Sequence, residues 1–185
     1  MSDSTNAEQV SGNGATAELR IGVFVCHCGG NISDVVDVKR VAEEIGRIPG
    51  VVISTTHMFA CSDPGQAMIE QKIKELNLNR IIVAACSPSL HELTFRRTLD
   101  RAGLNRYLYE HTNIREQDSW VVTDKELATQ KATRLIRAAV ARVHREQIAG
   151  EQHHLEQILE RHLIGREGLG SRDGCGRDEP DREQA

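Results

Sequence analysis

The residues of this sequence best suited to chemistry are its cysteines. Cys26 and Cys28 stand one residue apart in the run VCHCGGN, and Cys61 and Cys86 occur singly further along the chain. Thiolates bind zinc and iron–sulfur clusters, and clustered cysteines in a reducing compartment serve metal or redox chemistry more often than structural disulfides. The fifth cysteine, Cys175, lies in a Gly- and charge-rich stretch. Such a stretch cannot bury a core, so we expect an unpaired thiol there.

The composition excludes several other classes of function. A formal net charge of −4 provides no basic face for nucleic acid,. No apolar run approaches the roughly 20 residues that a membrane-spanning helix requires. The first 18 residues lack the basic region and apolar core of a signal peptide,. We therefore expect a cytoplasmic protein with neither a nucleic-acid nor a membrane partner.

Short apolar segments precede the cysteines and are typical of buried β-strands. The expected strands are residues 19–26, 51–57, 80–85 and, more weakly, 107–112. The Cys-X-Cys pair ends the first strand, Cys61 follows the second by four residues, and Cys86 closes the third.

Helical periodicity or capping residues follow each strand. The expected helix starts are Ser33 or Asp34, Asp63-Pro64, Ser87-Pro88 and Asp124. An aspartate followed by proline suits a helix start, because the aspartate caps it and proline at the first position loses no hydrogen bond. The last helix is expected to run to about Arg145, with a break near Gly150 and further helical tendency to Ile164.

Strands that alternate with helices predict a three-layer α/β domain. We expect a Rossmann-like or flavodoxin-like fold, with a mostly parallel sheet of about four strands followed by a long C-terminal helix. The expected divisions are a disordered N-terminal tail, the α/β domain, a helical extension and a disordered Gly- and charge-rich tail, at residues 1–18, 19–146, 147–165 and 166–185.

This fold predicts where the cysteines meet. The carboxyl ends of parallel strands share one edge of the sheet, where ligands bind beside the switch in strand order, and neighbouring strands are under about 5 Å apart. Each cysteine loop also leads into a helix N-terminus, whose free N–H groups and partial positive charge favour anions. A cluster held by four thiolates is anionic, and Gly29, Gly30 and Gly65 leave room for it,.

Three other interpretations of the cysteines stay open. They could be packed in the core as free thiols. They could bind zinc, although structural zinc sites usually pair cysteines two to four residues apart, and here one Cys-X-Cys pair and two single cysteines lie on three loops,. A thiol–disulfide enzyme is disfavoured, because the chain has no matching Cys-X-X-Cys arrangement.

Four stretches resemble the N-terminal domain of the A subunit of heterodisulfide reductase. They are RIGVFVCHCGGNI, MFACSDPGQ, LNRIIVAACSPSLHELTFRRTLDRAGLN and NIREQDSWV. The likeness covers about residues 19–146. It implies an iron–sulfur domain of a soluble flavin-based electron-transfer complex of anaerobic metabolism, with flavoprotein and other iron–sulfur subunits as partners. On this interpretation Cys26, Cys28, Cys61 and Cys86 hold one 4Fe–4S cluster.

The chain departs from that family in two respects. Full-length members continue into FAD-binding and ferredoxin-type domains, whereas this sequence has neither a G-x-G-x-x-G run after a strand nor the four-cysteine ferredoxin run,. We therefore expect no FAD site in this chain, and FAD in a partner or in full-length relatives. In addition, Asp118 stands where relatives commonly have cysteine, so its role as a ligand is an open question.

Several residues near the expected site have two interpretations. We expect the His27 side chain to point away from the cluster, and Asn113, Arg115, Glu116 and Gln117 to brace the cysteine loops. His91 and Glu92 are expected at a solvated helix end, with proton transfer or a partner contact as the alternative. Arg96 and Arg97 are expected to form local ion pairs rather than to bind a phosphate. The single tryptophan, Trp120, is expected in the core or at a domain interface, and His153, His154 and His162 on a polar helix face.

The leading hypothesis is an electron-transfer module that need not be a catalyst alone. The rival hypothesis is a docking or assembly domain with a structural zinc or no metal.

Overall fold

The computed structural model describes residues 18–167, and the side chains of residues 18–147. The predicted tails, 1–18 and 166–185, lie almost entirely outside the described residues, as does Cys175. The chain forms two compact units, one that ends at Gln147 and one that begins at Ile148. Everything below concerns the first unit unless stated.

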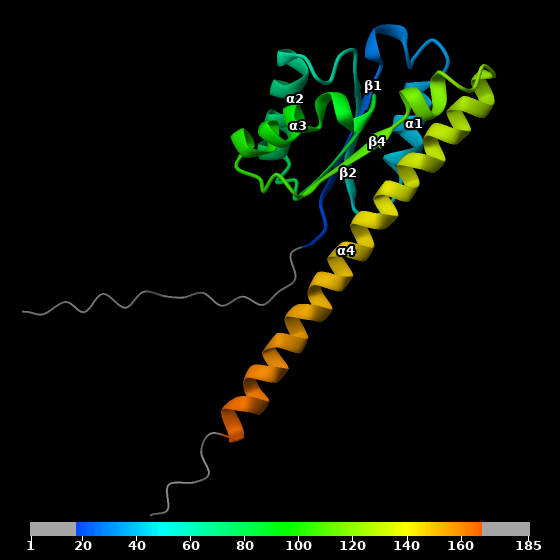
Figure 1. Ribbon diagram of the computed structural model, residues 1–185. Helices are drawn as coiled ribbons and strands as arrows, with labels where there is room; N and C mark the ends of the chain where they lie inside the picture. Colours follow the sequence, from blue (N-terminus) through cyan, green and yellow to red (C-terminus); the bar gives the residue numbers. More distant parts are fainter. Residues whose placement is uncertain (1–17, 168–185) are drawn as a thin grey trace, which may run out of the picture. The chain divides into compact units, whose positions relative to one another are not determined.

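Four parallel strands form the sheet. They are β1 (Ile21–Cys26), β2 (Val51–His57), β3 (Arg80–Ala85) and β4 (Tyr109–Asn113), in the spatial order β2-β1-β3-β4. The four main helices are α1 (Val38–Ile45), α2 (Asp63–Glu75), α3 (Pro88–Ala102) and α4 (Lys125–Glu167) (Figure 1). The predicted α/β class, the parallel sheet and the long C-terminal helix are therefore confirmed.

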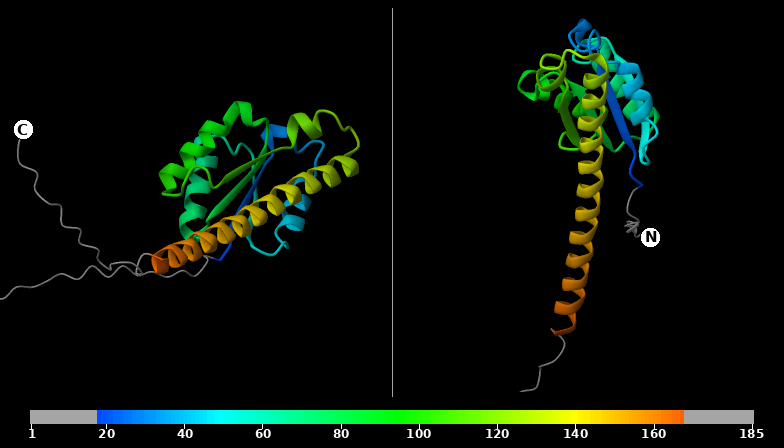
Figure 2. Two further views of the ribbon diagram at one scale, coloured as in Figure 1. Left: turned by 60° about the horizontal axis from the view of Figure 1, so that its bottom comes forward. Right: turned by 90° about the vertical axis from the view of Figure 1, so that its right-hand side faces the viewer.

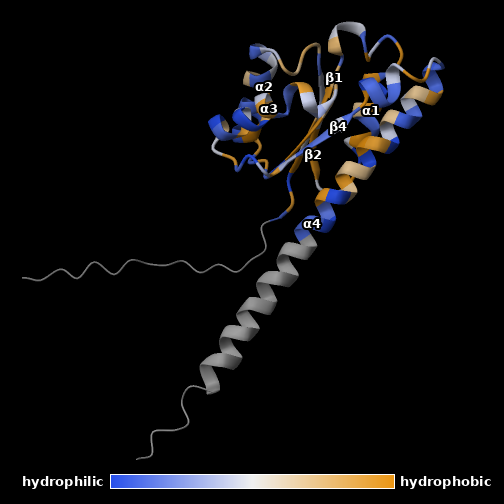
Figure 3. Ribbon diagram, in the orientation of Figure 1, coloured by the Kyte–Doolittle hydropathy of each residue, from blue (hydrophilic) through white to orange (hydrophobic). Residues whose placement is uncertain are grey.

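Helices cover both faces of the sheet. Figure 1 and the two further views in Figure 2 show α2 and α3 on one face, and α1 and the first part of α4 on the other. Alternate residues of β1 point to opposite layers, so that Val23 and Val25 pack with α1 and α4 whereas Phe24 packs with α2 and α3. Figure 3 shows the resulting apolar strands between helices with polar outer faces. A sheet covered on both faces needs nearly continuous apolar strands, which explains the composition of β1 and β3.

Two helix starts differ from the sequence prediction. The first helix begins at Val38, where Asp37 accepts a hydrogen bond from the Arg40 N–H, and not at residue 33 or 34. The residues before it form tight turns that bury Ile32 and Val36, and this four-residue spacing alone does not distinguish such turns from a helix. In α2 the N-cap is Ser62 rather than the residue after it, because the Ser62 hydroxyl accepts from the Gly65 N–H at 3.3 Å.

The other helix boundaries follow the sequence closely. Ser87 caps α3, and Gly103 ends it in the left-handed conformation with φ 81°. Asp124 accepts from the Leu127 N–H at 2.8 Å at the start of α4. This helix continues through Gly150 without the predicted break, since one glycine inside a helix costs only about 1 kcal/mol. None of the described helices is long and apolar enough to cross a membrane.

Candidate metal centre

The carboxyl ends of the strands lie side by side. Cys26, the last residue of β1, is in register with His57, the last residue of β2. Ala85 at the end of β3 is likewise in register with Asn113 at the end of β4. The first crossover leads from β1 to β2 and the next leads back past β1 to β3, so the strand order switches beside β1,.

The structure places all four predicted cysteines at this edge. Cys26 ends β1, Cys28 begins a 3₁₀ turn two residues later, Cys61 lies in the turn between β2 and α2, and Cys86 directly follows β3. Cys26 and Cys86 are buried, whereas Cys28 and Cys61 are partly exposed, and all four are free thiols. Their assignment as ligands stays a prediction.

Backbone N–H groups point at the first sulfur. The Cys28 N–H donates to Cys26 Sγ at 3.2 Å, and the Ala60 N–H donates to it at 3.4 Å. A further bond, from the Gly29 N–H to the Met58 carbonyl at 3.2 Å, joins the loop after β1 to the loop after β2. The two loops therefore form one unit around Cys26 Sγ, and these amides suit a sulfur that carries negative charge.

The Cys-X-Cys loop has an unusual backbone. Cys28, Gly29 and Gly30 have φ values of 53°, 59° and 101°. Glycine adopts positive φ without strain, but cysteine does so at a cost of about 1–2 kcal/mol. Gly29 is required for a second reason, because a Cβ there would lie 2.6 Å from carbons of the Phe59 ring. Cys28 is thus held in a strained conformation of the kind found at functional sites.

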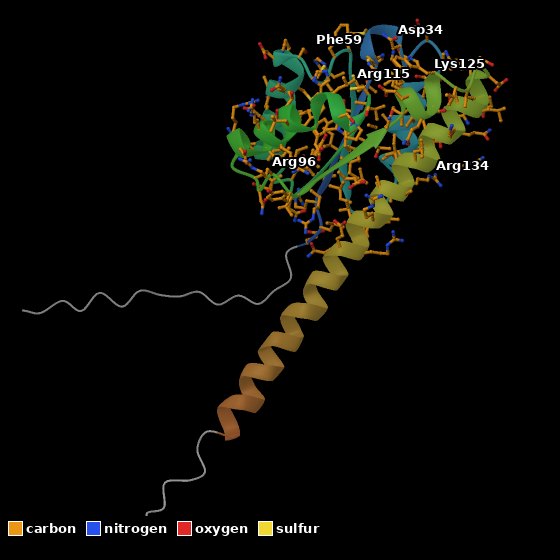
Figure 4. All side chains as sticks on the ribbon, in the orientation of Figure 1. Asp34, Phe59, Arg96, Arg115, Lys125 and Arg134 are labelled. Carbon is orange, nitrogen blue, oxygen red and sulfur yellow. The ribbon has the colours of Figure 1, made fainter. Side chains whose placement is uncertain are left out.

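Arg115 brings a positive charge to the second cysteine. Its Nη1 donates to Cys28 Sγ at 3.2 Å, while its Nη2 donates to Glu116 Oε1 at 2.7 Å. The guanidinium carbon lies 4.7 Å from the centre of the Trp120 ring, in a cation–π contact,. Figure 4 shows Arg115 at the same end of the domain as Phe59. From the sequence, Arg115 was predicted to brace the cysteine loops, but its hydrogen bond to the Cys28 sulfur was not predicted.

A short π-helix, Arg115–Ser119, holds this arginine in place. The Asn113 side-chain oxygen accepts from the Arg115 and Glu116 N–H groups at 3.1 and 3.0 Å. At the other end, the Ser119 hydroxyl donates to the Asn31 carbonyl at 2.8 Å, which ties the π-helix to the Cys-X-Cys loop. Single turns of π-helix occur often at functional sites.

The four thiols act on one another electrostatically. Burial raises the pKa of the Cys26 thiol, the Ala60 and Cys28 N–H groups oppose the rise, and the charges of Cys28 and Cys61 add to it. Burial also raises the pKa of Cys86 to about 11, against the opposing effect of Arg115 and with the support of Cys28 and Cys61. Binding of a metal ion or a cluster through thiolates must therefore displace protons from at least these two thiols.

A partly buried hydrogen-bonded pair supports the third cysteine loop. The His111 Nε2 atom lies 2.8 Å from the Cys86 carbonyl oxygen, and the Tyr109 hydroxyl contacts His111 Nδ1. Since a carbonyl can only accept, His111 carries its proton on Nε2 and accepts from the Tyr109 O–H. Burial lowers the pKa of His111 and favours this neutral form. Neither residue was predicted from the sequence, although their two-residue spacing on β4 places them on the same face.

Asp118 lies in the same π-helix, but its carboxylate forms no hydrogen bond. It is fully buried, and neither of its carboxylate oxygens has a hydrogen-bond partner. Burial raises its pKa to about 6, opposed by Lys131 and the Ala132 N–H, both from α4. The groups acting on its charge thus belong to the helical layer and not to the cysteine loops.

The remaining candidate residues have other surroundings. Burial lowers the pKa of His27, and the positive charges of Lys39 and His57 add to this effect. Glu92 forms an ion pair with Arg96 at 2.6 Å on α3. Trp120 is 57% exposed, so it does not belong to the core, and a domain interface stays a prediction. The side chains of His153, His154 and His162 lie outside the described residues.

The residues at this edge are of the types that hold iron–sulfur clusters in proteins,. Among residues 18–147, no three Cys, His, Asp or Glu side chains are grouped closely enough to hold one metal ion. A tetrahedral zinc site with bonds of about 2.3 Å would hold its sulfurs about 3.8 Å apart. A four-iron cluster is larger than one ion, so its ligands stand further apart. Free thiols from three loops, amide donors and a nearby arginine suit such an anionic group.

The comparisons with known proteins bear on this site. No family model matches the chain. The chain is 57% identical over 126 residues to the A subunit of the H₂:CoB–CoM heterodisulfide,ferredoxin reductase of Methanothermobacter thermautotrophicus. It is 54% identical over 129 residues to an iron–sulfur A subunit of the CoB–CoM heterodisulfide reductase of Methanopyrus kandleri. These matches cover 68% and 69% of this chain.

The α/β domain is homologous to a domain of the heterodisulfide reductase A subunit. A protein of Archaeoglobus profundus that is named for its likeness to this subunit agrees, at 48% identity over 129 residues. The chain spans only about a fifth of the length of these relatives, 19%, 20% and 18% in turn. The resemblance to heterodisulfide reductase found in the sequence is thereby confirmed for the domain.

Proposed function

We propose that this domain binds one 4Fe–4S cluster through Cys26, Cys28, Cys61 and Cys86 and transfers single electrons within a heterodisulfide-reductase-like complex. The observation that carries the proposal is the position of four free thiols, on three loops, at one edge of the sheet. A relative described as an iron–sulfur subunit supports it. When bound, the cluster would supply a one-electron redox centre.

The chain's own residues would hold and tune that centre. The Ala60 and Cys28 N–H groups stabilise negative charge on Cys26 Sγ. Helices α2 and α3 begin within two residues of Cys61 and Cys86, and their N-termini favour an anion,. Burial of Cys26 and Cys86 limits the access of water to two of the four sulfurs.

The partners we propose are a flavoprotein and other iron–sulfur subunits. One relative is named as a subunit of a reductase for both a CoB–CoM heterodisulfide and ferredoxin. The sequence has no dinucleotide-binding G-x-G-x-x-G run after a strand,. The flavin step is therefore assigned to a partner or to the further domains of full-length relatives, and this domain would relay electrons between centres.

The test is anaerobic purification followed by iron and sulfide analysis and electron paramagnetic resonance. We expect about four irons and four sulfides per chain, as the cluster formula requires. Serine at position 26, 28, 61 or 86 should lower the iron content, because serine is a poorer iron ligand. Cys175→Ser is the control and should leave it unchanged. A colourless protein that holds zinc or no metal would refute the proposal and favour a docking domain.

A further inference from the structure

We propose that Arg115 is a positioning residue that sets the reduction potential of this site through its contact with Cys28 Sγ. The inference rests on the proposed function, because it concerns the thiolates that would hold the cluster. The observation behind it is the 3.2 Å hydrogen bond from Nη1 to the sulfur.

Arg115 is held on three sides. Its Nε and Nη2 atoms donate to Glu116 Oε1, and its guanidinium carbon lies 4.7 Å from the centre of the Trp120 ring. Its backbone N–H is bonded to Asn113. The Arg115 side chain is only 15% exposed, so water screens its charge less than that of a surface arginine. Such a fixed charge acts on the sulfur in every molecule and not only in a fraction of rotamers.

A fixed positive charge beside the site has a definite effect on electron uptake. Reduction adds one negative charge, so a nearby cation stabilises the reduced state more than the oxidised state and raises the potential. The Glu116 carboxylate has the opposite effect and offsets part of the increase. Both charges lie at the site, because the Arg115 guanidinium donates to Cys28 Sγ at 3.2 Å and to Glu116 Oε1 at 2.7 Å.

Substitutions that remove the charge of Arg115 or of Glu116 should therefore shift the reduction potential in opposite directions. Arg115→Gln should lower the reduction potential by about 59 mV, which is a tenfold change in the one-electron equilibrium. Glu116→Gln should raise the potential. Arg115→Lys, which keeps the charge, should restore most of the wild-type value. A residue that only supported the fold would not give opposite shifts for these two substitutions.

A matched control is available on α3. Arg96 also forms an ion pair, with Glu92 at 2.6 Å, and also lies over an aromatic ring, that of Tyr107 at 5.2 Å. Figure 4 shows it away from Arg115. Arg96→Gln should leave the potential unchanged.

The experiment is a redox titration of each anaerobically purified variant, followed by electron paramagnetic resonance. Potentials that are equal in wild type and Arg115→Gln would overturn the inference while leaving the proposed function intact. Loss of iron from Arg115→Gln, with or without loss from Arg115→Lys, would overturn it, because Arg115 would then hold the cluster in place rather than set its potential. A wild-type chain without iron would refute the proposed function, and this inference with it.

Discussion

Replacement of Cys28 by glycine should stabilise the metal-free domain relative to its replacement by alanine. Both variants lack the sulfur, so both lose the hydrogen bond from Arg115. They differ in the backbone, because Cys28 has φ 53°. Alanine keeps the strain of a left-handed conformation, about 1–2 kcal/mol, and glycine relieves it. Glycine also gives the unfolded chain more conformational freedom, which lowers the free energy of unfolding by about 0.4–1 kcal/mol and offsets part of this gain. The net difference should be about 1 kcal/mol in favour of glycine.

Urea unfolding of the two metal-free proteins under reducing conditions measures this difference. With a denaturant slope of about 2 kcal/mol per molar urea, the midpoint of Cys28→Gly should lie about 0.5 M above that of Cys28→Ala. The control is the same pair of substitutions at Cys61, which is not among the described residues with positive φ. There glycine should be the less stable of the two. Equal midpoints at position 28 would show that the loop relaxes and that Cys28 stores no strain.

Two further predictions concern groups around the site. At pH 8, Asp118→Asn should be more stable than wild type by on the order of 2 kcal/mol, because the buried carboxyl has its pKa raised from 3.8 to about 6,. A raised carboxyl pKa means that the folded state binds more protons, so wild-type stability falls as the pH rises from about 4 to 6, and the two proteins should converge below pH 4 in thermal melts. Parallel pH profiles would show that the carboxyl is solvated. Tyr109→Phe should destabilise the metal-free domain by about 1 kcal/mol in urea melts through loss of its bond to His111,, whereas Tyr107→Phe, at an exposed position, should change little.

Much of the fold follows from local sequence signals. The bounds of β2 and β3 agree with the prediction, because their apolar runs are flanked by turn residues. The predicted start of α1 was wrong by four residues relative to Asp34, since Ile32 and Val36 are buried in turns with helix-like spacing. Hydrophobic spacing reports which residues are buried and not which local hydrogen bonds they form.

The site was less predictable than the fold. The positions of Cys26 and Cys86 at strand ends, together with parallel topology, were enough to place them at one edge. The partners of those sulfurs were not predictable, because they depend on tertiary geometry. The Ala60 N–H has no sequence signal at all, and the direction of the Arg115 side chain depends on a π-helix that no periodicity indicated.

The Cys28 backbone opposes stability at one of the predicted ligands. Cys28 has a left-handed conformation with φ 53°, which costs about 1–2 kcal/mol,. A domain that used these thiols only for packing would gain stability from glycine at position 28. The thiol there is better explained by ligation, because the free energy of binding a cluster is available only to the folded chain and can offset local strain.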